Sequence, residues 1–155
     1  RKQNLMPRKF ERRIQVSDLQ IETFALDGQQ EHDGQAFPLA YHCDSAEATL
    51  DETTAWTTEF ADKLCSQASS HGTVLLRGFP LGSAEDFDAM VEASGLPGFS
   101  YDDSLSNAYR INFTPRVFSA NEAPPEATIS LHHEMAQTPI YPSKLFFFCQ
   151  VHLLV

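Results

Sequence analysis

The sequence predicts an α+β fold, because helical and strand-like patterns lie in different parts of the chain. The strongest helical pattern lies at about residues 52–69, where apolar side chains recur at steps of four in one stripe: Trp56, Phe60, Leu64 and Ala68. Three strand-like runs come later, at residues 116–120, 128–135 and 144–151. We therefore expect helices in the first half and a sheet that only begins towards the end of the sequence.

The segments on either side of the expected first helix predict different structures. Residues 1–50 are polar and rich in turn signals, so we expect an irregular lead-in with one short strand near residues 21–26. After the helix, the β-rich run Thr73–Arg77 ends at Gly78 and predicts a buried strand.

A second helix is expected soon after that strand. Ser83, with Asp86 three residues later, is an N-cap signature, and the apolar face of the helix would be Phe87, Met90 and Val91. Gly95 marks its end, and the polar and aromatic stretch at residues 99–116 favours a long surface loop.

Length, charge and cysteine content narrow the class of protein. The 155 residues are enough for one domain, and the longest apolar run has five residues, so no membrane span is expected. We divide the chain into a polar arm at residues 1–36, disordered at its basic start, and a domain at 37–155. The three cysteines are odd in number and far apart, which favours small core roles for Cys65 and Cys149 and a reducing, cytoplasmic location.

The net charge of −10 is unevenly distributed. From Ile14 onward there are five basic and 20 acidic side chains, a balance of −15 that repels phosphate backbones and argues against nucleic-acid partners. Six basic residues lie within the first 13 positions, which leaves open a nucleic-acid or membrane-surface arm or part of an organelle import signal. We favour a plain solvated terminus. As the partner of the chain we expect a small molecule, and neither nucleic acid nor a membrane.

The most informative short pattern for chemistry lies at residues 129–135. On a strand, alternate side chains share a face, so Ser130, His132 and Glu134 would point to one side. An imidazole and a carboxylate in that arrangement supply two of the three ligands of a 2-His-1-carboxylate iron site. His-x-Glu also occurs by chance, and we interpret the neighbouring His133 as a packed or half-exposed histidine. The chain lacks a zincin His-Glu-x-x-His, a Gly-x-Ser-x-Gly nucleophile turn and a phosphate-binding loop.

Several ordered blocks carry a family resemblance, and they lie at residues 72–80, 86–87, 116–125, 131–137 and 141–149. Together they resemble the TauD/TfdA-like family of Fe(II)/2-oxoglutarate dioxygenases, and most of all its clavaminate synthase-like branch. The resemblance covers about residues 37–151. It implies a double-stranded β-helix (jelly roll) with flanking helices, His132 and Glu134 as the first two iron ligands, 2-oxoglutarate as cosubstrate, and oxidation of a small molecule.

The end of the sequence departs from the family pattern. Members carry a Gly-Gly-x-Thr-Pro turn after the strand that corresponds to Leu145–Cys149, then a distal iron-binding His and an Arg that pairs with 2-oxoglutarate. None of these follows Gln150. We therefore expect a truncated, partial dioxygenase domain, and whether the chain is itself an enzyme stays open. We expect His152 to be solvated and not a substitute ligand.

A non-enzymatic alternative also stays open. A jelly roll with half of its strands would expose an apolar sheet edge around Leu145–Phe148, through which an inactive domain could self-associate or bind another chain.

Three polar residues near the expected iron site are candidates for binding a carboxylate. Arg116 and Asn121 are the candidate substrate-binding residues, and Arg110 could also provide a guanidinium fork. The alternative for all three is a surface or loop-fixing role. We expect Lys144 to extend from a strand end to solvent.

Overall fold

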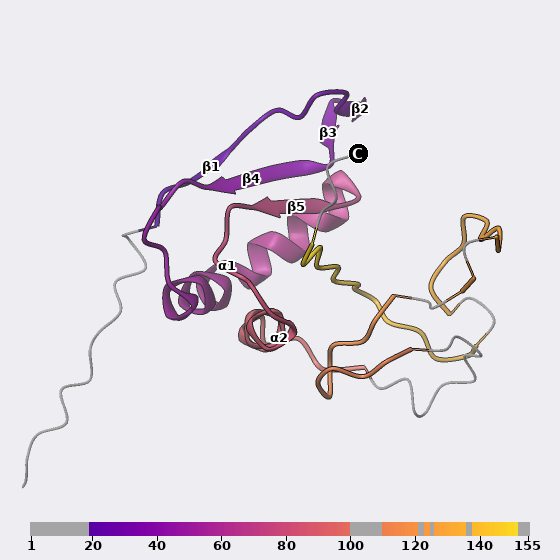
Figure 1. Cartoon of the computed structure of the whole chain (residues 1–155). Coiled ribbons are helices and arrows are strands. Elements are labelled where there is room, and N and C mark those ends of the chain that lie inside the picture. Colours follow the sequence, from indigo (N-terminus) through magenta and orange to yellow (C-terminus); the bar gives the residue numbers. More distant parts are fainter. Residues whose placement is uncertain (1–18, 100–109, 121–122, 125, 136–137, 152–155) are drawn as a thin grey trace, which may run out of the picture.

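The computed structural model describes residues 19–99, 110–120, 123–124, 126–135 and 138–151 (Figure 1). Its elements follow in the order β1 (Ile21–Thr23), β2 (Gln30–His32), β3 (Gln35–Phe37), β4 (Leu39–Cys43), α1 (Leu50–His71), β5 (Val74–Arg77) and α2 (Ala84–Ala93). Among the described residues, this combination of two helices and two small sheets confirms the α+β class. The expected layout was wrong, because the strands lie at residues 21–77 and not towards the end of the sequence.

The larger sheet has the strand order β1-β4-β5. β1 runs antiparallel to β4, whereas β5 runs parallel to β4 with Leu39 opposite Val74. A parallel pair needs a long connection, and α1 provides it while covering one face of the sheet (Figure 1). The strand predicted at Thr73–Arg77 is thus confirmed as β5, but its apolar residues are half-buried and not buried as predicted.

The smaller sheet is the hairpin of β2 and β3, with Gln30 opposite Phe37. Its two-residue turn, Asp33-Gly34, has positive φ at both positions (51° and 77°), as a type I′ turn requires. The expectation of a single short strand in residues 1–50 was therefore incomplete. The strands β2 and β3 are mostly polar and exposed, so they carry no apolar alternation that would predict them.

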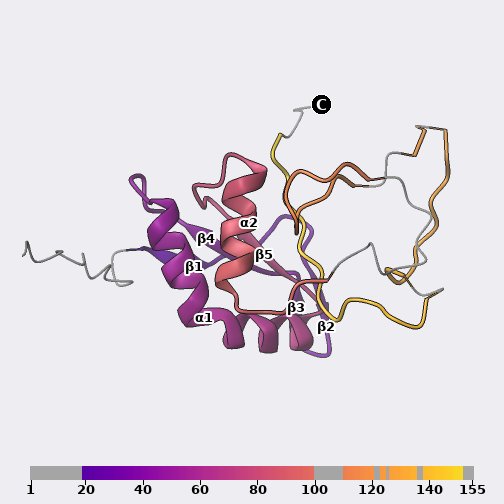
Figure 2. The same cartoon turned by 90° about the horizontal axis from the view of Figure 1, so that it is seen from below.

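Both helices begin at capping boxes, of which the sequence analysis predicted the one at Ser83. Thr49 and Glu52 form a capping box at the start of α1, and Ser83 and Asp86 form one at the start of α2. The helices lie side by side (Figure 2), and the Thr58 hydroxyl donates to the carbonyl of Ala93 at 3.0 Å. Both predicted helices are confirmed.

Gly78, directly after β5, is a position where only glycine fits. Its φ is +75°, and a Cβ there would collide with the carbonyl oxygen of Cys43. The close approach of this turn to the end of β4 therefore depends on the missing side chain.

The three strand predictions after residue 100 were wrong. Within residues 110–120 there is one isolated bridge, between Asn112 and Phe118, and the described residues of 128–135 and 144–151 form no strand. Apolar or β-branched residues favour a strand only where a partner strand completes its hydrogen bonds, and these runs have none among the described residues. Cys149 is exposed and Cys65 is half-buried, so the expected core role fails for Cys149, whereas Cys43 is buried.

Candidate functional site

The segment that carries His132 and Glu134 is an extended loop that ends in a turn, not a strand. Met135 has a φ of +58° and is buried, and the Thr138 amide donates to its carbonyl at 3.0 Å. The turn breaks the strict alternation of side chains that a strand would impose. His132 and His133 are both exposed, so His133 is not packed in the core, while Glu134 is half-buried.

The ring of His132 is oriented by the backbone carbonyl of Ser130. Its Nδ1 lies 2.8 Å from the carbonyl oxygen of Ser130. A carbonyl oxygen can only accept, so Nδ1 carries a hydrogen, and in the neutral imidazole the lone pair is then on Nε2. Histidines that bind metals through one ring nitrogen commonly donate from the other in this way. The geometry therefore fits a ligand role for His132.

The carboxylate of Glu134 is held by Arg110, 24 residues earlier in the chain. The Nη2 of Arg110 lies 2.9 Å from Oε1 of Glu134, and the two side chains are 19% and 18% exposed. A hairpin-like loop presents Arg110: the Ser119 amide donates to the Ile111 carbonyl at 2.8 Å, and the Ile111 amide donates to the Ser119 hydroxyl at 2.9 Å. The pair fixes the position of one oxygen-donor side chain beside a permanent cation.

Arg116 points its guanidinium to α2. It donates to both carboxylate oxygens of Asp88, at 2.8 and 3.1 Å, and its Nη2 lies 3.1 Å from Glu92. The hydrogen bond to Asp88, followed by the charges of Asp88 and Glu92, raises the pKa of Arg116 above its ordinary value. In this arrangement Arg116 fastens the loop at residues 110–120 to α2, and Arg110 is on the same loop.

The remaining candidate residues divide into two groups. Asn121 and His152 lie outside the described residues. Lys144 is exposed and donates to the carbonyl of Ser143 at 3.3 Å. Among the described residues, no three His, Cys, Asp or Glu side chains gather closely enough to hold a metal ion. The structure thus brings Glu134 together with Arg110, a contact that the sequence did not predict because it spans two loops.

The same part of the chain matches known proteins. A family model described as "Taurine catabolism dioxygenase TauD, TfdA family" matches residues 35–153. A clavaminate synthase-like protein of Arabidopsis thaliana is 50% identical over 80 residues, which are 52% of this chain and 24% of that protein. The matched region thus spans about a quarter of the length of the relative.

Within the described residues, no helix is both long and apolar enough to cross a membrane. The family match includes the His132-x-Glu134 segment, the loop that carries Arg110 and Arg116, and all elements from β3 to α2. Because it covers most of the sequence, the chain belongs to the TauD/TfdA family of dioxygenases.

Proposed function

We propose that this chain carries part of an Fe(II)- and 2-oxoglutarate-dependent dioxygenase domain that oxidises a small molecule. In the complete domain, with a jelly-roll scaffold, His132 and Glu134 supply two metal ligands. The observation that carries the proposal is the orientation of His132, whose Nδ1–H is used by the Ser130 carbonyl. Membership of the TauD/TfdA family supports it. The odd number of widely spaced cysteines supports a reducing, cytoplasmic location.

The donor chemistry fits two positions of an iron site with one carboxylate. His132 would bind through Nε2, with the Ser130 carbonyl holding the plane of the ring. Glu134 would bind through its carboxylate while Arg110 holds that group in place from one side. When bound, iron would supply the oxidative chemistry, with dioxygen and 2-oxoglutarate as co-reactants. The protein side chains would supply orientation and one negative charge.

A matched pair of variants tests the proposal, because His132 and His133 are adjacent and both exposed. We expect the 155-residue chain to bind Fe(II) in anaerobic calorimetric titration, and His132→Ala to weaken this binding by at least about tenfold. His133→Ala should bind as the unmodified chain does. Any conversion of 2-oxoglutarate to succinate should likewise be reduced in His132→Ala and unchanged in His133→Ala. Equal metal binding by both variants, or no binding by the unmodified chain, would contradict a ligand role for His132.

A second candidate function is an interaction module, and exposed apolar side chains in the second half of the chain favour it. Leu131, Phe147 and Val151 are 105%, 86% and 74% exposed. Side chains of this kind gain free energy when another surface covers them. The occupant that we propose is a second copy of this chain, and the candidate fails if the chain stays monomeric at high concentration.

A further inference from the structure

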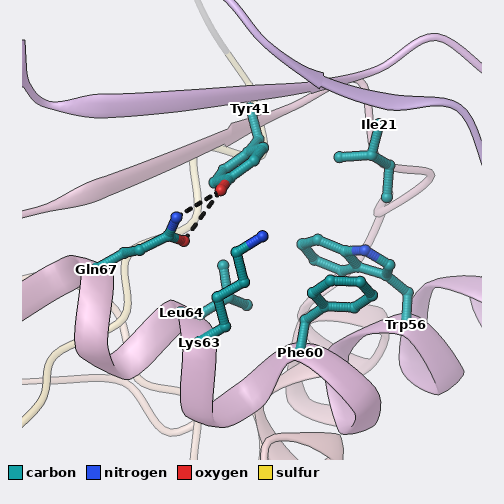
Figure 3. A pocket seen from close by; sticks show the side chains of 7 residues that line it. All are labelled: Ile21, Tyr41, Trp56, Phe60, Lys63, Leu64 and Gln67. Carbon is teal, nitrogen blue, oxygen red and sulfur yellow. Dashed lines mark hydrogen bonds between the residues drawn. The ribbon is translucent and has the colours of Figure 1, made fainter.

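A small cavity lies between the larger sheet and α1, and the described residues that line it belong to β1, β4 and α1 (Figure 3). Its volume is about 100 Å³. The residues that give it its chemical character are Ile21, Tyr41, Trp56, Phe60, Lys63 and Gln67. None of them belongs to the segments that carry the candidate metal ligands, so the cavity is separate from the site proposed above.

One wall of the cavity is aromatic. The rings of Trp56 and Phe60 are stacked, with centroids 5.4 Å apart and planes 24° apart. Trp56 is only 5% exposed, and its ring also packs against that of Phe79, with centroids 5.1 Å apart. The position of the Trp56 ring is therefore fixed by its neighbours. A rigid aromatic surface of this kind favours a planar ring as a binding partner.

The polar groups of the cavity are of two kinds. The Tyr41 hydroxyl and the Gln67 side-chain amide satisfy each other, with distances of 3.0 and 2.7 Å from the phenol oxygen to Oε1 and Nε2. The ammonium group of Lys63 points between this pair and the aromatic wall (Figure 3). It lies 5.5 Å from the centroid of the Phe60 ring, and no carboxylate of the described residues is within ion-pair distance of it. Lys63 therefore supplies a positive charge beside an apolar hollow.

We propose that this cavity binds a small aromatic carboxylate, with its ring against Trp56 and Phe60 and its carboxylate paired with Lys63. Size limits the ligand to a single ring that enters only in part: an engineered cavity of about 150 Å³ encloses benzene, whereas this one has about 100 Å³ and is open on one side, where the carboxylate would stay. A fused ring system would not fit. Charge complementarity selects an acid, because Lys63 is the cation at the opening and the neighbouring phenol and amide already bond to each other.

The only tryptophan of the chain, Trp56, provides the readout, since any change in intrinsic tryptophan fluorescence must come from it. We would titrate the 155-residue chain with benzoate, with the neutral analogue benzyl alcohol and with acetate. The expected result is a saturable change with benzoate, about fivefold weaker binding of benzyl alcohol, as one exposed ion pair allows, and no response to acetate. Equal affinity for benzoate and benzyl alcohol, or no saturable change with benzoate, would overturn the proposal.

A charge-removing variant tests the role of the lysine. Lys63→Met keeps an apolar side chain of similar length, so the affinity for benzoate should fall to that for benzyl alcohol. Lys144→Met, which removes an exposed lysine elsewhere, is the control and should bind benzoate as before. Far-UV circular dichroism establishes that both variants are folded. If a folded Lys63→Met chain binds benzoate with unchanged affinity, the assignment of the carboxylate to Lys63 is wrong.

Discussion

At the scale of single residues, the carboxylate of Glu134 is placed by a contact between two loops. Arg110 reaches it at 2.9 Å with both side chains largely shielded from water. An ion pair with this degree of burial is stronger than an exposed one, because solvent screens it less. Both residues were candidates from the sequence alone. Their contact could not be predicted, because it depends on how the loop at residues 110–120 is fastened to α2 through Arg116.

A double-mutant cycle measures this contact. Arg110→Met and Glu134→Gln should each lower the free energy of unfolding by about 1–2 kcal/mol, because each leaves a polar partner less well satisfied. The double variant should lose less than the sum, with a coupling energy of about 1 kcal/mol in urea unfolding. Arg77→Met is the control, since Arg77 is exposed and contacts the Phe24 ring at 5.9 Å. A coupling energy of zero would show that the pair contributes nothing to stability.

At the scale of elements, both helices begin with a capping box. In α1, the side chain of Glu52 accepts from the Thr49 hydroxyl and backbone amide, at 2.7 and 2.8 Å. In α2, Asp86 accepts from the backbone amides of Gly82 and Ser83, at 2.9 and 3.1 Å. The hydrogen bond from the Thr49 side chain lowers the pKa of Glu52, and that from the Gly82 backbone amide lowers the pKa of Asp86. The Ser83–Asp86 pattern helped to predict α2 from the sequence, whereas α1 was predicted from its apolar stripe and its cap was found only in the structure.

The lowered pKa values predict how stability depends on pH. Each carboxylate titrates at a lower pH in the folded chain than in the unfolded one, whose ordinary values are 4.5 for Glu52 and 3.8 for Asp86. The stabilisation is therefore complete above those values and is lost as the pH falls through the lower folded values. Urea unfolding between about pH 7 and about pH 3 should show this loss. In Glu52→Gln and Asp86→Asn, the free energy of unfolding should fall less steeply with falling pH than in the unmodified chain. Slopes identical to that of the unmodified chain would refute the capping contribution.

At the scale of the whole molecule, residues 144–151 join parts that are distant in sequence. Phe148 stacks on Phe87 of α2, with centroids 5.2 Å apart and planes 23° apart, and the Gln150 amide donates to the Gly82 carbonyl at 3.1 Å. In Figure 1 this yellow segment returns from the loops towards the helices. The neighbouring Phe147 is 86% exposed. Adjacent phenylalanines thus have opposite roles, one in packing and one on the surface.

Variants of Phe147 and Phe148 distinguish an effect on stability from an effect on self-association. Phe148→Ala should lower the free energy of unfolding by about 1–3 kcal/mol, because it removes the stacked ring and leaves a gap against α2. Phe147→Ala should leave the unfolding free energy nearly unchanged and weaken any dimerisation, because it removes exposed apolar area. Urea unfolding and sedimentation velocity over a range of concentrations measure the two effects. A monomeric unmodified chain at all concentrations would rule out the interaction-module candidate.

The division between what sequence and tertiary structure decide follows the range of the interactions. The cap of α2, the apolar stripe with Trp56 and the β-rich run of β5 can be recognised in neighbouring residues, so the sequence by itself predicted these elements, together with the α+β class and the family. The predictions at residues 128–135 and 144–151 failed because a strand needs a partner that local pattern does not reveal. Tertiary structure alone decided that Arg110 pairs with Glu134, that Arg116 faces α2, and that Ile21 and Tyr41 close a cavity over α1, since each contact joins segments that only the folded chain brings together.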